Sequence, residues 1–218
     1  MPLTIEASKL TLNDVHRLFK LEKQVGSSFT KLLSLEPLTD IEQQDLLRIK
    51  NDFERYFSAG KVSEGLVKFL TLAPLMRLAG FYDMPIRMTM EDIIAIAVED
   101  EETTITGRMD ILAVNNADSE TIPLFWILVI EAKNSAIDAL EGLPQLLTYT
   151  FKSLEQQSSV WGLTTNGKSY RFVYLRRGNP PTYQILSELN LIDDDRLIQL
   201  LQVFKAICKL QNVQLQLA

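Results

Sequence analysis

One feature of the sequence constrains the fold more than any other: an apolar run, Leu124–Ile130, that ends abruptly in Glu131-Ala132-Lys133. The run is too short to span a bilayer. It is rich in β-branched and aromatic residues, which predicts a strand buried on both faces of a sheet. Because residues two apart on a strand share a face, Glu131 and Lys133 are expected to lie together at its end. Charges in such a place are costly unless they are paired, bound to a metal or functional.

An aspartate is expected beside this pair of charges. The segment Gly107–Val114 has the character of the preceding strand, and Asp110 lies within it. Two neighbouring strands can bring Asp110, Glu131 and Lys133 within a few ångströms of one another. Two carboxylates suit a hard cation such as Mg²⁺, and the ammonium would lie beside a water held by that ion. The structural alternative is a buried ion pair next to an unrelated strand aspartate.

The remaining pattern predicts a mixed sheet. We expect the first core strand to end with Asp92–Val98 and the second to cover Thr103–Val114, so that they form an antiparallel meander with the apolar run. A helix is predicted over Ala136–Leu154, with Pro144 interrupting it or marking its first turn. The next strand, Ser159–Leu163, follows a strand–helix unit and should lie parallel to the apolar run.

Two further elements complete the C-terminal half. Tyr170–Leu175 should pair back as a hairpin, because Asn166-Gly167 is a strong turn signal. A final helix is expected over Arg196–Leu210.

The first 60 residues are predicted to be a helical extension. Thr11 can cap a short helix, and Thr39 with Glu42 has the form of a capping box that starts a helix towards Ser58. Ser63 is expected to cap the next helix, which Pro74 would kink or split. We therefore predict an extension over residues 1–60 and an α/β domain over residues 61–218.

Length, charge and cysteine content narrow the function classes. The chain has 218 residues, which suffices for one domain with a full core. Its net charge of −6 argues against tight binding to DNA without a metal, because phosphate binding depends on Lys and Arg. The lone Cys208 and an N-terminal segment without the features of a signal peptide favour a cytoplasmic protein, and no stretch is long enough to cross a membrane.

Several short motifs together resemble a known family. Asp110 followed by a hydrophobic strand ending in Glu131-Ala132-Lys133 resembles the signature of PD-(D/E)XK nucleases. The wider order is similar to the N-terminal nuclease domain of type I restriction enzyme R subunits. The segments that carry this similarity lie between Lys61 and Leu175; they are Ser63–Leu70, Pro74–Phe81, Gly107–Asp110, Glu131–Lys133, Gln145–Tyr149 and Gly162–Gly167.

The resemblance implies a restriction-endonuclease-like mixed sheet flanked by helices, which hydrolyses DNA with Mg²⁺ or Mn²⁺. The metal ligands implied are Asp110, Glu131 and the Ala132 carbonyl, and Lys133 would orient the attacking water. The remaining residues implied at the site are Gln145 and Tyr149, which share a helix face, and Glu64 as a ligand or orienting base. The partners implied are DNA, other subunits of a restriction system and a second copy of the chain.

Two alternatives remain open at this point. The chain could be a catalytically inactive binding or accessory subunit whose carboxylates serve only an ion pair, which its acidity favours. The third interpretation rests on Gly162–Ser169, which matches the phosphate-binding pattern G-x-x-x-x-G-K-S. A strand pattern follows this motif where a phosphate-binding loop would open into a helix, which disfavours a nucleotide binder.

Overall fold

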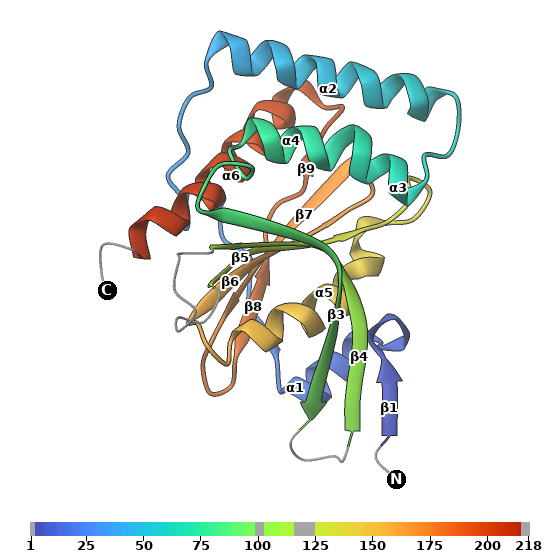
Figure 1. The fold of residues 1–218 in the computed structure, drawn as a ribbon, viewed down its shortest axis with the longest axis vertical. Coiled ribbons are helices and arrows are strands. Elements are labelled where there is room, and N and C mark those ends of the chain that lie inside the picture. The colour runs from blue at the N-terminus through green and yellow to red at the C-terminus, as the bar shows by residue number, and fades with distance from the viewer. Residues whose placement is uncertain (1–2, 99–102, 116–124, 215–218) are drawn as a thin grey trace.

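The computed structural model describes residues 3–98, 103–115 and 125–214. Within those residues a nine-stranded mixed sheet lies between two sets of helices (Figure 1). The strands are β1 (Leu3–Glu6), β2 (Glu22–Lys23), β3 (Ile86–Val98), β4 (Thr103–Asn115), β5 (Phe125–Ala132), β6 (Ser159–Thr165), β7 (Ser169–Arg176), β8 (Thr182–Ile185) and β9 (Leu189–Asn190). Leu124, the first residue of the predicted apolar strand, lies outside the described residues.

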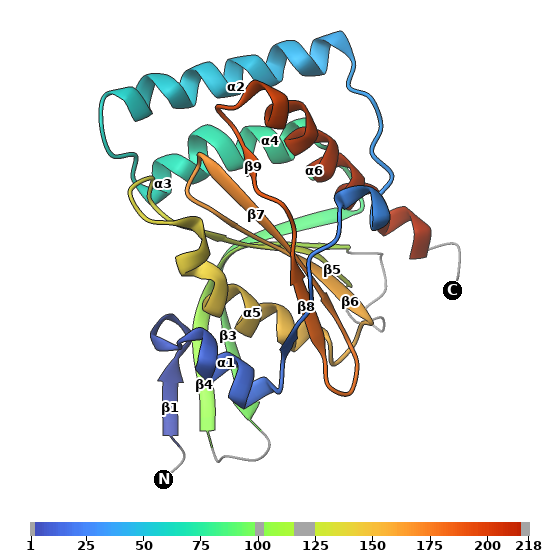
Figure 2. The same ribbon diagram turned by 180° about the vertical axis from the view of Figure 1, so that it is seen from behind.

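The helices lie on both faces of the sheet. They are α1 (Leu12–Phe19), α2 (Asp40–Ser58), α3 (Glu64–Val67), α4 (Ala73–Leu78), α5 (Leu143–Ser153) and α6 (Asp194–Gln214), with a π-helical turn η3 (Lys68–Leu72) and 3-10 turns η1 (Ala7–Lys9), η2 (Phe29–Lys31) and η4 (Ala139–Gly142). In both ribbon views α2, α4 and α6 lie on one side of the sheet, and α1 and α5 lie on the other (Figures 1 and 2).

Alternation along β5 divides the core between these two sides. Leu128 and Ile130 belong to the apolar cluster under α2, α4 and α6, whereas Val129 belongs to the cluster under α1 and α5. All three side chains are fully buried. The strand is therefore covered on both faces, as its continuous apolar run predicts.

The predicted order of the central strands is confirmed. β3, β4 and β5 are successive antiparallel strands, and β6 lies parallel to β5. β6 and β7 form an antiparallel hairpin whose turn contains Gly167 with a φ of +87°. This left-handed conformation is one that glycine adopts readily, which explains the turn signal.

The segment predicted as a helical extension, residues 1–60, contains short strands as well as helices. The capped helices α1 and α2 are present, with capping boxes at Thr11 and Thr39. The segment also contributes β1, which pairs with β4, and β2, which pairs with β8. Phe53 of α2 is fully buried in the same cluster as the sheet residues. These first residues therefore complete the sheet and its core.

Two predicted helices are shorter or less regular than expected. The helix predicted from Ala136 starts as the 3-10 turn η4, and its α-helical part begins at Leu143 with Pro144 in the first turn. The helix after Ser63 is interrupted by the π-helical turn η3, which ends before Pro74. Pro74 lies in the first turn of α4, where its missing N–H is tolerated. None of the helices in the described part of the chain has the length and apolar character that a membrane span requires.

Candidate functional site

Strand β4 has a gap along one of its edges. β5 pairs with its C-terminal part from Ile111 onward, and β1 pairs with its N-terminal part up to Thr106. Between these two partners, the ladders of the described strands leave Gly107 to Asp110 unpaired on that edge. Backbone polar groups at a buried position need other partners, so side chains are expected to fill the gap.

Asp110 fills the end of the gap next to β5. Its Oδ2 atom accepts a hydrogen bond of 2.7 Å from the backbone N–H of Ala132, and the residue is only 7% exposed. The carboxylate thus replaces the strand partner that β5 loses where β4 diverges from it. The same bond fixes Asp110 against the Glu131–Lys133 end of β5, where the sequence predicts it to lie.

Tyr149 of α5 fills the other end of the gap. Its phenol lies so close to Gly107 that a Cβ atom there would meet the hydroxyl at 2.5 Å. Burial raises the pKa of Tyr149. Gly107 is therefore needed for the close approach of Tyr149, independently of any turn.

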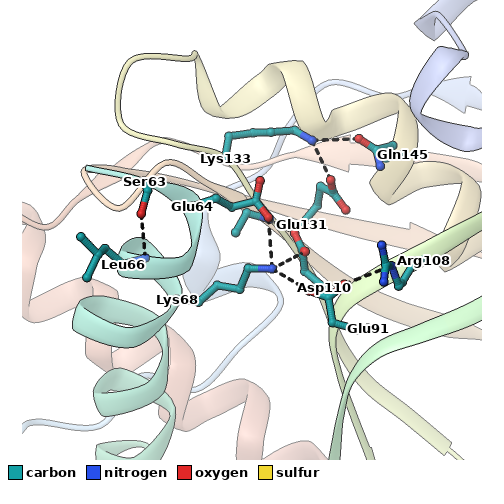
Figure 3. A network of polar contacts seen from close by, with 11 residues as sticks. Ser63, Glu64, Leu66, Lys68, Glu91, Arg108, Asp110, Glu131, Lys133 and Gln145 are labelled. Carbon is teal, nitrogen blue, oxygen red and sulfur yellow. Dashed lines mark hydrogen bonds and ion pairs between the residues drawn. The ribbon is translucent and has the colours of Figure 1, made fainter. Parts of the chain in front are cut away.

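A chain of hydrogen bonds joins β5 to α5. Lys133 Nζ donates to Glu131 Oε1 at 2.7 Å and to Gln145 Oε1 at 2.8 Å (Figure 3). Gln145 Nε2 donates to the Tyr149 hydroxyl at 3.3 Å, as the shared helix face of these two residues predicts. Glu131, Lys133, Gln145 and Tyr149 therefore form one continuous network.

A second network converges on the ammonium of Lys68. Its Nζ atom lies 2.6 Å from Asp110 Oδ1, 3.0 Å from Glu91 Oε1 and 3.1 Å from Glu64 Oε1 (Figure 3). Burial by itself would lower the pKa of Lys68, but the bonds to these carboxylates raise it above its ordinary value. Glu91 Oε2 also pairs with Arg108 Nε at 3.1 Å. Lys68 is therefore a charged, immobilised cation beside Asp110.

Glu131 is the most electrostatically strained group of the site. Burial and the nearby charge of Asp110 raise its pKa from 4.5 to about 7, against the opposing effect of Lys133. Its Oε2 atom is buried and has no hydrogen-bond partner among the described residues. An unpaired oxygen on a buried carboxylate is costly and indicates a missing donor or cation.

The predicted site residues share one open cavity of about 540 Å³. Those that line it are Glu64, Asp110, Glu131, Lys133, Gln145 and Tyr149. Glu6 and Ser8 from the N-terminal segment line it as well. The arrangement therefore unites all six side chains that the sequence analysis selected.

Three further charged residues belong to the site and were not selected from the sequence. Lys68 lies four residues after Glu64 and Arg108 two before Asp110, so helix and strand periodicity could have indicated both. Glu91 had no such signal. It interrupts the β3–β4 ladder with a φ of +59°, and its contact with Lys68 depends on how the helix lies against the sheet.

The donor set fits a divalent cation of the hard type. Among the described residues, no three His, Cys, Asp or Glu side chains form a ready-made metal cluster. Mg²⁺ commonly takes only one or two carboxylates and keeps several waters, so Asp110 and Glu131 are a sufficient protein contribution. The unpartnered Glu131 Oε2 supplies a free oxygen for such an ion. Ala132, whose carbonyl is the third predicted ligand, is held next to Asp110 by its backbone N–H.

The segment that matches the phosphate-binding pattern has a different structure. Gly162 lies within β6 and Ser169 begins β7, so the described segment is strand, turn and strand with no helix after it. A helix N-terminus facing a nucleotide phosphate is therefore absent from residues 159–176.

Comparison of the chain with known protein families and with curated protein sequences finds no match.

Proposed function

We propose that the protein is a metal-dependent DNA endonuclease with a restriction-endonuclease-like core, as its resemblance to PD-(D/E)XK nucleases implies. The observation that carries the proposal is the convergence of Asp110, Glu131 and Lys133 at the gap of β4, inside one cavity. A buried carboxylate pair with an adjacent ammonium has little structural reason to occupy the end of a central strand.

Each residue has a role in this proposal. Asp110, Glu131 and the Ala132 carbonyl would hold Mg²⁺ or Mn²⁺, which supplies Lewis acidity and acidifies water. Lys133, held by Glu131 and Gln145, points its ammonium at the cavity, where it can orient a nucleophile and stabilise negative charge on a phosphate. Gln145 and Tyr149 keep Lys133 in place from α5, and Glu64 stands at the cavity rim.

The direct test is nicking of supercoiled plasmid with Mn²⁺. We expect the wild type to cut and Asp110→Ala to be inactive. Lys133→Met should reduce the rate by about a hundredfold while Mn²⁺ binding is largely kept, since removal of one charge-stabilising donor has that effect. The matched control is Lys152→Met, because Lys152 forms a comparable 2.7 Å pair with Glu155 on the surface. Wild type that neither nicks DNA nor releases heat with Mn²⁺ would refute the proposal.

One observation favours a second candidate, an inactive accessory subunit. The Lys68 ammonium neutralises Asp110 at 2.6 Å, so the carboxylate has a protein counterion of its own. A module of this kind would bind DNA or another subunit of a restriction system without cutting. It predicts equal, negligible nicking by wild type and Asp110→Ala.

A further inference from the structure

Lys68 occupies its carboxylate cluster in the way a bound cation would. An ammonium has three N–H donors, and Asp110, Glu91 and Glu64 provide three acceptors within 3.1 Å of its nitrogen. The side chain is 12% exposed, so water contributes little to its solvation. The ammonium therefore donates hydrogen bonds to Asp110 and Glu91 and forms an ion pair with Glu64, so that carboxylates from a helix and two strands surround it.

This position conflicts with a divalent cation on Asp110. Asp110 Oδ2 is taken by the Ala132 N–H, and Oδ1 is taken by Lys68 at 2.6 Å. A cation bound to Oδ1 would lie in direct contact with the ammonium, and repulsion between like charges at that separation is severe in a partly buried site. The two cations are thus alternatives at this oxygen.

A separate observation shows that one carboxylate oxygen of the site has no partner among the described residues even with the Lys68 ammonium in place. Lys68 bonds to Asp110, but the buried Oε2 of Glu131 has no partner within the described part of the chain. Glu131 is only 3% exposed and lines the same cavity as Asp110. A cation that contacted both carboxylates would satisfy an oxygen that Lys68 does not reach.

We propose that Lys68 is a resident cation of this cluster, and that a divalent cation binds Asp110 only after the ammonium leaves it. The proposal rests on the proposed function only for the location of the ion at Asp110 and Glu131. Lys68 then sets the affinity for the metal, since every binding event must break the Lys68–Asp110 bond.

The surroundings of Lys68 allow such a move at limited cost. Glu64 and Glu91 are 43% and 47% exposed, whereas the Asp110 side chain is 10% exposed. Both glutamates can therefore follow the ammonium towards the cavity rim and keep it paired. Lys68 also begins the π-helical turn η3, so its backbone lies at an irregular point of the helix.

The first test measures Mn²⁺ affinity by titration calorimetry. We expect Lys68→Met to bind Mn²⁺ at least about tenfold more tightly than wild type, because a competing positive charge is removed. Lys68→Arg keeps the charge and should retain the low affinity. Lys50→Met is the matched control: Lys50 is equally buried, at 13% exposure, but pairs with Asp194 at another place. The double variant Lys68→Met/Asp110→Asn should not bind Mn²⁺ more tightly than wild type, which would place the ion at Asp110.

The second test uses the unmodified chain and does not depend on how a variant folds. Acetylation by acetic anhydride, followed by mass spectrometry, reports whether each lysine amine is free. Lys68 should be protected without metal and become several-fold more reactive with Mn²⁺, whereas Lys50 should not change.

The outcomes separate this inference from the proposed function. Equal or weaker Mn²⁺ binding by Lys68→Met overturns the inference, as does a lack of binding by both proteins or continued protection of Lys68 in Mn²⁺. If the wild type binds Mn²⁺ and Lys68 becomes reactive but DNA stays intact, only the nuclease proposal is refuted. If the wild type cleaves DNA but Lys68→Met binds Mn²⁺ with the same affinity as wild type, this inference fails and the nuclease proposal stands.

Discussion

Side chains complete the backbone hydrogen bonding at both ends of β5, but they do so with different chemistry. At the N-terminal end, Gln157 accepts from the Trp126 N–H at 2.9 Å and donates to the Trp126 carbonyl at 3.0 Å. At the C-terminal end, Asp110 accepts from the Ala132 N–H. One end is served by a neutral amide, and the other by a carboxylate.

The two ends differ in what the substitute partner itself requires. Among the described residues, the Gln157 amide bonds further to the Ser159 carbonyl alone, at 2.7 Å, and needs no charge nearby. Asp110 needs the Lys68 ammonium, and its charge also raises the pKa of Glu131. An amide oxygen could accept the same hydrogen bond from the Ala132 N–H, so the hydrogen bonding of the sheet does not require a carboxylate at this position. The C-terminal end therefore carries a charge that the hydrogen bonding of the strand does not need, which supports the proposed site.

The largest expected effect comes from exchanging the carboxylate for an amide. Asp110→Asn can still accept from the Ala132 N–H, but it removes the nearest counterion of the Lys68 ammonium, so the free energy of unfolding should fall by about 2 kcal/mol. If the proposed function is right, DNA hydrolysis should fall by about a thousandfold, because the charge that would bind the cation is lost. Urea denaturation and nicking assays on the same preparation measure both. A variant that is severely destabilised would show that the carboxylate has a structural role.

The reciprocal change at the neutral end should affect stability alone. Gln157→Leu leaves the buried N–H and C=O of Trp126 without partners, which should cost about 3 kcal/mol of unfolding free energy. Nicking activity per folded molecule should equal that of wild type, and urea denaturation gives the stability. Loss of activity in folded Gln157→Leu would mean that the two ends are coupled through β5.

The raised pKa of Glu131 gives the charged end a pH signature. Between its ordinary pKa of 4.5 and its folded pKa of about 7, the native state binds more protons than the unfolded chain. The unfolding free energy of the metal-free protein should therefore fall as pH rises from 5 to 7, by about 2 kcal/mol more in wild type than in Glu131→Gln. Chemical denaturation in EDTA at both pH values measures the difference. Parallel pH profiles of the two proteins would contradict the assignment.

The smallest expected effect tests how closely the site is packed. A Cβ atom on Gly142 would lie 2.9 Å from Glu131 Cγ and 3.3 Å from Lys133 Cε. Gly142→Ala should therefore displace both side chains and lower the nicking rate about tenfold, since small misplacements of catalytic groups are expensive. Gly65→Ala is the control, because nothing lies within 4 Å of its added Cβ and alanine favours the helix. Equal rates for the two variants would mean that the site tolerates the shift.

The central strands and the main carboxylates could be predicted because their signals are local. The apolar run of β5, the Asn166-Gly167 turn and the spacing of Glu131 and Lys133 each depend on neighbouring residues. Such patterns survive in any tertiary context that buries the strand. Only the convergence with Asp110 required an assumption, namely that β4 and β5 are adjacent.

The missed features are set by tertiary contacts. Three of the strands that were not predicted, β1, β2 and β9, are at most four residues long, which is too short for the alternation of apolar and polar residues to be recognised. They form because they pair with longer strands of the sheet. The role of Lys68 depends on how the helix that contains it lies against β3 and β4. No spacing in the sequence encodes that arrangement, which places the Lys68 ammonium 2.6 Å from Asp110.

Glu91 marks a position where thermostability and the charge network make opposite demands. A non-glycine residue with φ of +59° carries a conformational penalty of about 1 kcal/mol or more, which glycine would relieve. A stability-guided redesign would therefore replace this glutamate early. The resulting protein would melt later, but Lys68 and Arg108 would both lose an acceptor. A redesign for higher melting temperature should therefore keep Glu91.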